Sequence, residues 1–92
     1  MDANTKLRRS PDASFEVVAG EAIVIHLKTG VYYSLNEIGT VFWKMVDGSR
    51  TVTSCAEEIA ALSVDAPPIE VITADLIEVA EKLLHEELLM VM

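Results

Sequence analysis

The sequence predicts an α+β fold in which a three-stranded antiparallel sheet is followed by three helices. Three observations predict it: β-branched and aromatic runs come before residue 36, segments of helical periodicity come after it, and turn residues separate these elements. The chain has 92 residues, 51% of them hydrophobic, which is typical of one small globular domain. We expect that domain at residues 13–92, behind a flexible polar tail at residues 1–12.

The three strands are expected to form a meander. Their approximate bounds are residues 15–19, 22–27 and 31–35. Gly20 and Glu21 fit a two-residue turn with glycine first, which joins antiparallel strands. The sheet is therefore predicted to be local, with each strand pairing with the next along the chain.

Alternate side chains of the third strand point to opposite faces of the sheet. Val31, Tyr33 and Leu35 are therefore expected on one face, and Tyr32 and Ser34 on the other. We predict that Tyr33 belongs to the core and that Tyr32 is partly exposed beside the last helix.

The first helix is expected at about residues 37–47. Asn36 suits its N-cap, because the side chain can accept a hydrogen bond from a free N–H of the first turn. Gly48 suits its end, because glycine readily adopts the left-handed conformation found there. Apolar residues recur at helical spacing on one face: Ile38, Val41, Phe42, Met45 and Val46.

The second helix is expected to end near Leu62, and its start is open to two interpretations. Thr51 and Thr53 are both candidate N-caps. Ser54 with Glu57 also makes a capping box one step later.

The third helix is expected from about Ile69 to Glu86, after a turn at residues 63–68. Its apolar surface is wider than one face requires, because Val71, Ile77 and Leu84 lie beside the main stripe. Two interpretations remain open. The helix packs against both the sheet and the other helices, or part of the stripe lines an open groove for a partner.

Charge is distributed unevenly along the chain. The formal net charge is −8, and residues 51–92 hold nine acidic residues against one base, Lys82. Nucleic-acid binding requires a clustered basic surface, so no nucleic-acid partner is expected. No apolar run is long enough to span a membrane, and the first residues lack the apolar core of a secretory signal. We expect a cytoplasmic protein with no membrane partner.

Residues with catalytic potential are few and isolated. His26 lies inside an expected strand and His85 near a helix end, without metal-ligand spacing around either. Cys55 is the single cysteine and lies on the apolar stripe of the second helix, where it is expected to behave as a small hydrophobe. These features predict a protein that is not an enzyme and that holds no cofactor and no metal.

Several of these motifs together resemble a known family. They lie in the order T-G-x-Y-Y-x-L-N-x-x-G, then an aromatic-rich helix, then D-G-x-x-T. The matching residues are Thr29, Gly30, Tyr32, Tyr33, Leu35, Asn36, Gly39, Trp43, Asp47, Gly48 and Thr51. Over roughly residues 7–89, the chain is similar to the pyrroloquinoline quinone (PQQ) biosynthesis protein D family. This family is grouped with the recognition elements that bind leader peptides of ribosomally synthesised, modified peptides.

The resemblance implies a winged helix-turn-helix and a non-catalytic role. In the family, the leader of a precursor peptide adds as a strand beside the last helix and is presented to a modifying enzyme. That enzyme is a radical SAM enzyme in PQQ-type maturation or a protease in lasso-peptide maturation. Carried onto this chain, the expected peptide-binding residues are Val31, Tyr32, Tyr33, Ser34, Leu35, Ile72, Asp75, Leu76, Val79, Lys82 and Leu83. A monomer or weak dimer is expected.

One feature departs from the family, and one alternative function competes with peptide binding. The last helix of the family often ends before a glycine, whereas this chain has His85, Glu86 and Glu87. The alternative is a winged-helix regulator that binds DNA. It requires a basic recognition helix, but the expected second helix carries Glu57 and Glu58 and no base.

Overall fold

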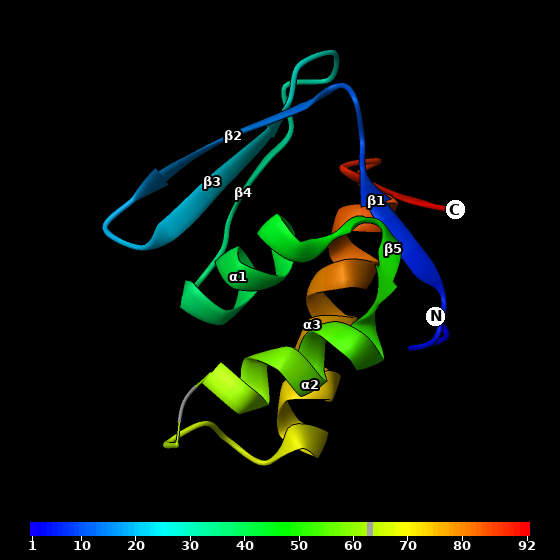
Figure 1. The fold of residues 1–92 in the computed structure, drawn as a ribbon. Coiled ribbons are helices and arrows are strands. Elements are labelled where there is room, and N and C mark those ends of the chain that lie inside the picture. The colour runs from blue at the N-terminus through cyan, green and yellow to red at the C-terminus, as the bar shows by residue number, and fades with distance from the viewer. Residues whose placement is uncertain (63) are drawn as a thin grey trace.

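The computed structural model describes residues 1–62 and 64–92. Its described residues form the strands β1 (Lys6–Arg9), β2 (Ala13–Val18), β3 (Glu21–His26), β4 (Tyr32–Ser34), β5 (Asp47–Thr51) and β6 (Leu89–Val91), and the helices α1 (Glu37–Met45), α2 (Val52–Leu62) and α3 (Ile69–His85). The strands make two antiparallel sheets, in the orders β2-β3-β4 and β5-β1-β6 (Figure 1). The predicted α+β class, with a local meander ahead of three helices, is confirmed.

The meander β2-β3-β4 projects from the helices as a twisted ribbon (Figure 1). Val18 pairs with Glu21, so the β2–β3 turn is Ala19-Gly20, one residue earlier than the predicted Gly20-Glu21. Ala19 and Gly20 both have positive φ, 53° and 82°. Positive φ at both central positions is the geometry of a type I′ turn, which matches the twist of the flanking strands.

A second sheet joins the two ends of the chain. Strand β1 pairs with β5 on one side and with β6 on the other, and Leu7 of β1 is fully buried. A flexible tail was expected at residues 1–12, but residues 6–9 of that segment form β1, so this expectation is wrong. Three of the four residues of Lys6–Arg9 are basic, so the segment lacks the apolar alternation that predicts a strand. Distant partners hold it in place.

The core lies between α1, the helix pair α2 and α3, and the inner face of the meander. Trp43 and Phe42 of α1 are fully buried, and the rings of Trp43 and Phe15 meet edge to face with centroids 5.9 Å apart. The main stripe of α3 is buried as well: Ile72, Leu76, Ala80 and Leu83. Of the residues beside that stripe, Ile77 and Leu84 are partly buried against this core, whereas Val71 is 46% exposed, so neighbouring elements cover only part of the wide apolar surface.

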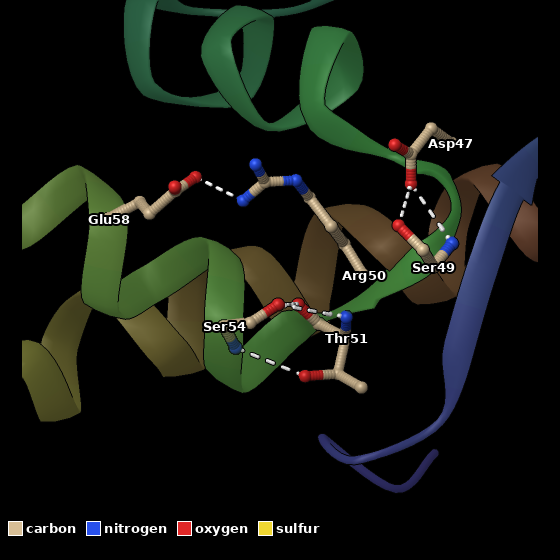
Figure 2. Close-up of polar contacts among 6 residues, drawn as sticks. All are labelled: Asp47, Ser49, Arg50, Thr51, Ser54 and Glu58. Carbon is tan, nitrogen blue, oxygen red and sulfur yellow. Dashed lines mark hydrogen bonds and ion pairs between the residues drawn. The ribbon is translucent and has the colours of Figure 1, made fainter.

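The helix starts follow the capping chemistry of the sequence, with one correction. The Asn36 side chain accepts from the Gly39 N–H at 2.8 Å, which confirms that cap. At α2, the Ser54 N–H donates to Thr51 Oγ1 at 3.1 Å and the Thr51 N–H donates to Ser54 Oγ at 3.0 Å (Figure 2). The capping box is therefore Thr51 with Ser54, and neither Thr53 nor the Ser54–Glu57 pair starts the helix. In the same figure, Arg50 forms an ion pair with Glu58 of α2.

The end of α3 is closed by a left-handed turn. The Leu88 N–H donates to the Leu83 carbonyl at 2.8 Å, and the Glu87 N–H donates to the Leu84 carbonyl at 3.1 Å. These two bonds define a Schellman motif, in which the residue at the turn is left-handed and usually glycine. Here that residue is Glu87, with φ of 59°. The turn redirects the chain, so that residues 89–91 become β6 rather than an extension of the helix.

Helix α3 begins where the sequence predicts. The turn expected at residues 63–68 includes Ser63, which lies outside the described residues, and α3 then begins at Ile69 as expected. Within the part of the chain that the structure describes, no helix has both the length and the apolar character needed to cross a membrane.

Candidate functional site

Strand β4 is an edge strand with backbone groups open to a further strand. The Leu35 N–H donates to the Ala22 carbonyl at 2.8 Å, and the His26 N–H donates to the Val31 carbonyl at 2.8 Å. In an antiparallel ladder, alternate residues direct their backbone groups toward the same neighbour. Tyr32 and Ser34 therefore direct their N–H and C=O groups away from β3, toward the open edge.

A cavity of about 120 Å³ lies between this edge and α3. Its lining consists of Tyr33, Ser34 and Leu35 from the strand side and Val79, Lys82 and Leu83 from the helix side. Leu35 and Leu83 are buried, whereas Tyr33 and Val79 are half-buried, so the walls are mostly apolar. We call this cavity, together with the open edge of β4, the β4–α3 groove.

Lys82, the one charged residue in the lining of the cavity, is paired with an acidic residue of its own helix. Lys82 is exposed and forms an ion pair with Glu78 one helical turn earlier, at 3.3 Å. Glu81 is held at 3.2 Å by the N-terminal ammonium group of Met1. Both pairs are exposed enough for solvent to screen them, so they orient side chains more than they stabilise the fold.

The side chains of the remaining expected site residues lie outside the lining of the cavity. Val31 precedes β4 and is partly buried, while Tyr32 is 68% exposed on the opposite face of the sheet. Asp75 is exposed on α3 outside the lining of the cavity. Ile72 and Leu76 have no exposed surface and belong to the core. Helical periodicity groups these two with Leu83, but the neighbouring elements cover them.

Two of the residues with catalytic potential, His26 and Cys55, have structural roles. His26 is buried, and its Nδ1 accepts from the N–H groups of Lys28 and Thr29 at 3.2 and 3.4 Å, which closes the β3–β4 turn. Cys55 is fully buried, and burial raises the pKa of its thiol to about 11. Among the described residues, no three His, Cys, Asp or Glu side chains gather into a possible metal site.

A larger cavity was not foreseen from the sequence. It has a volume of about 480 Å³ and lies where the β1–β2 connection, His26, the end of α3 and β6 meet; Ser10, Leu84 and Glu87 contribute to its wall. Its walls depend on β6 and on the left-handed turn at Glu87, and neither has a clear signal in the sequence.

Comparisons with known proteins agree on one fold. A family model described as coenzyme PQQ synthesis protein D matches residues 21–89. The solved structure "TbiB1 in Complex with the TbiA(beta) Leader Peptide" has a TM-score of 0.75 and 22% identity, covering 89% of this chain and 93% of its own. A lasso peptide synthetase B1 complexed with the leader peptide has a TM-score of 0.75 and 12% identity, covering 92% of this chain and 98% of its own. No curated protein matches the sequence significantly. The two structures show that the fold is shared.

Proposed function

Because this chain belongs to the family of coenzyme PQQ synthesis protein D, we propose that it is a non-catalytic module that binds the leader of a ribosomally made precursor peptide. The module then presents the leader to a modifying enzyme, in PQQ-type or lasso-peptide-type maturation. The two solved structures of similar fold are both complexes with a leader peptide, which supports this proposal. The observation that carries it is the open edge of β4 beside an apolar cavity.

Strand addition explains how the groove holds an extended peptide. The peptide backbone pairs with the free N–H and C=O groups of Tyr32 and Ser34, each bond contributing about 1 kcal/mol net. A peptide residue opposite Tyr33 projects its side chain to the same face as Tyr33, into the cavity. Burying one apolar side chain there adds about 1.5–3 kcal/mol. The cost of ordering the peptide offsets part of these contributions, so we expect a dissociation constant from about micromolar to tens of nanomolar.

The charges of the helices favour a peptide over DNA. Helix α2 has Glu57 and Glu58 exposed and no basic residue, and Lys82 is the one Lys or Arg of α3. A phosphate backbone would be repelled by these surfaces. A leader with Lys or Arg beside its apolar anchor is instead attracted by the exposed acidic residues of α3, which mainly raises the association rate.

Calorimetric titration tests the proposed function. The probe is the synthetic leader of the precursor peptide encoded beside this chain, and a scrambled leader of the same composition is the control. We expect 1:1 binding of the native leader and at least about tenfold weaker binding of the scrambled one. A native leader that does not bind at about 100 μM would contradict the proposal.

A further inference from the structure

Strand β6 is an edge strand of the second sheet, and part of its backbone is open to a further strand. The Met92 N–H donates to the Lys6 carbonyl of β1 at 3.0 Å. By the alternation of an antiparallel ladder, Leu89 and Val91 direct their N–H and C=O groups away from β1. Edge strands are normally protected by charged residues or proline, but the sequence of β6 is Leu-Met-Val. This edge can therefore accept an added strand.

The cavity of about 480 Å³ borders this edge, since Leu89, Met90 and Val91 all contribute to its lining. We call it the His26 cavity, because the His26 ring also lines it and is only 4% exposed. The Nδ1 of His26 accepts two backbone N–H groups of the β3–β4 turn, so the hydrogen of the neutral imidazole lies on Nε2. Among the described residues, no group accepts a hydrogen bond from this Nε2–H. A buried donor of this kind favours a ligand with an oxygen acceptor.

Ser10 adds a second donor to the same lining. It is 7% exposed, and its Oγ accepts the Asp12 N–H at 3.1 Å, which leaves the hydroxyl hydrogen without an acceptor among the described residues. The lining also contains the carboxylates of Asp12 and Glu87 and no Lys or Arg, so it disfavours an anionic ligand. The remaining lining residues are apolar: Pro11, Leu84, Leu89, Met90 and Val91. A neutral ligand with carbonyl oxygens and apolar groups fits this surface.

An extended peptide matches both polar features of the His26 cavity. One side of its backbone can pair with Leu89 and Val91, as in strand addition. Its remaining carbonyl groups can accept from the Nε2–H of His26 and from the Ser10 hydroxyl, while its side chains contact the apolar walls. Strand β6 has three residues, or about 10 Å of strand, so about three peptide residues pair with it. Such a short contact is weak unless the peptide is also held elsewhere.

The β4–α3 groove lies close enough to hold the same peptide. Consecutive residues of α3 line the two sites, Leu83 the groove and Leu84 the His26 cavity. A helix with its side chains is about 10–12 Å across, so about five to eight extended peptide residues connect the two sites. A precursor bound through its leader therefore presents the segment that follows the leader at an effective concentration of about millimolar.

We propose that the His26 cavity binds a short extended stretch of the precursor, in the segment that follows the leader. This inference rests on the proposed function, because the leader in the β4–α3 groove holds that segment within reach. The module then contacts the precursor at two sites. The second site favours a stretch without acidic residues, because Asp12 and Glu87 line the cavity. The two contacts together bind the full precursor more tightly than the leader alone.

Fluorescence anisotropy with two labelled probes tests this inference. One probe is the synthetic leader, and the other is the full precursor, which contains the same leader and the segment that follows it. We expect the parent protein to bind the precursor about tenfold more tightly than the leader.

A pair of variants at Val91 tests whether this difference arises at β6. Val91 is 59% exposed, and Val91→Pro removes its N–H from the open edge. Val91→Ala is the matched control, because it keeps the N–H. Both variants, checked for folding by circular dichroism, should bind the leader within about twofold of the parent. Val91→Pro should lose most of the tighter binding of the precursor, and Val91→Ala should retain it.

Amide hydrogen exchange on the parent protein gives a second readout that needs no variant. With the leader alone, the amides of Leu89 and Val91 should exchange as quickly as in the free protein. With the full precursor, both should slow by about tenfold or more, because they pair with the added strand. The signal of the His26 Nε2–H should also shift with the precursor and not with the leader.

The outcomes separate this inference from the proposed function. If the parent does not bind the leader, the proposed function fails and the inference fails with it. If the parent binds the leader and the full precursor equally well, only the inference fails. A folded Val91→Pro that retains the tighter binding of the precursor contradicts pairing with β6. A free parent that sediments as a dimer, and becomes a monomer on Val91→Pro, assigns the edge to a second copy and overturns the proposal.

Discussion

The Leu35 N–H donates to the Ala22 carbonyl at 2.8 Å, and this bond determines which groups of β4 remain free. Because Leu35 is turned toward β3, the preceding residue, Ser34, directs its N–H to the open edge. The proposed peptide site is therefore a consequence of strand register. A shift of one residue would turn Ser34 toward β3 and expose the backbone groups of Tyr33 instead.

Ser34→Pro should weaken leader binding without unfolding the sheet. Proline removes the N–H that faces the open edge, and edge strands tolerate proline where no ladder bond is lost. We expect about a fivefold to tenfold rise in the dissociation constant by calorimetry, which corresponds to about one lost hydrogen bond. Ser34→Ala is the matched control, because it keeps the N–H and should bind like the parent. Equal affinities for a folded Ser34→Pro and Ser34→Ala would contradict pairing at this residue.

Val79→Glu should weaken leader binding by about tenfold or more, because it places a carboxylate in the wall that receives an apolar side chain. Val71→Glu is the matched control on the same helix, since Val71 is 46% exposed and lies outside the lining. Leu76 is unsuitable for this test because it is fully buried, so a charge there would report on folding. Circular dichroism checks that both variants are folded. A folded Val79→Glu with the affinity of the parent would remove Val79 from the proposed site.

The local features of the fold were predictable from sequence, and the long-range ones were not. The Asn36 cap and the meander depend on neighbours within a few residues, which patterns record directly. Strands β1 and β6 are held together by pairing between residues 80 or more apart, such as Leu7 with Val91, and carry little apolar alternation of their own. Strand propensity depends strongly on such context.

The candidate site was predicted on its strand side better than on its helix side. An edge strand can be read from element order, but helical periodicity does not say which neighbour covers each part of a wide apolar surface. Ile72 and Leu76 therefore looked equivalent to Leu83, although only Leu83 among these three contributes to the lining.

Cys55 should react with thiol reagents only through unfolding. The thiol is fully covered, and burial raises its pKa to about 11 from an ordinary value of 9.0. Because the folded-state pKa is the higher one, its contribution to stability is complete below pH 9.0 and declines as pH rises toward 11. At pH 8, labelling should be slow in buffer and rapid in urea. Denaturant melts of the parent and Cys55→Ala should differ less at pH 11 than at pH 8. Rapid labelling of the folded parent would show that the thiol is accessible.

Glu87→Gly should stabilise the fold. Glu87 has φ of 59°, a left-handed conformation that costs an L-residue about 1–2 kcal/mol and glycine almost nothing. The greater freedom of glycine in the unfolded chain offsets part of this effect. We therefore expect the free energy of unfolding to rise by about 1 kcal/mol, or Tm by about 4–8 °C for a domain of this size. Glu86→Gly is the control, because Glu86 has φ of −91° and should gain nothing. Thermal melts that show no rise for Glu87→Gly would contradict the strain at this turn.

Amide hydrogen exchange at β4 tests most directly whether the leader adds as a strand. The free protein leaves the N–H groups of Tyr32 and Ser34 without a partner in the sheet, so both should exchange quickly in NMR spectra. With saturating leader, we predict that both amides slow by about tenfold or more. The amides of Leu89 and Val91, on the edge strand of the other sheet, should not change. A leader that binds while Tyr32 and Ser34 exchange as quickly as before would contradict strand addition at β4.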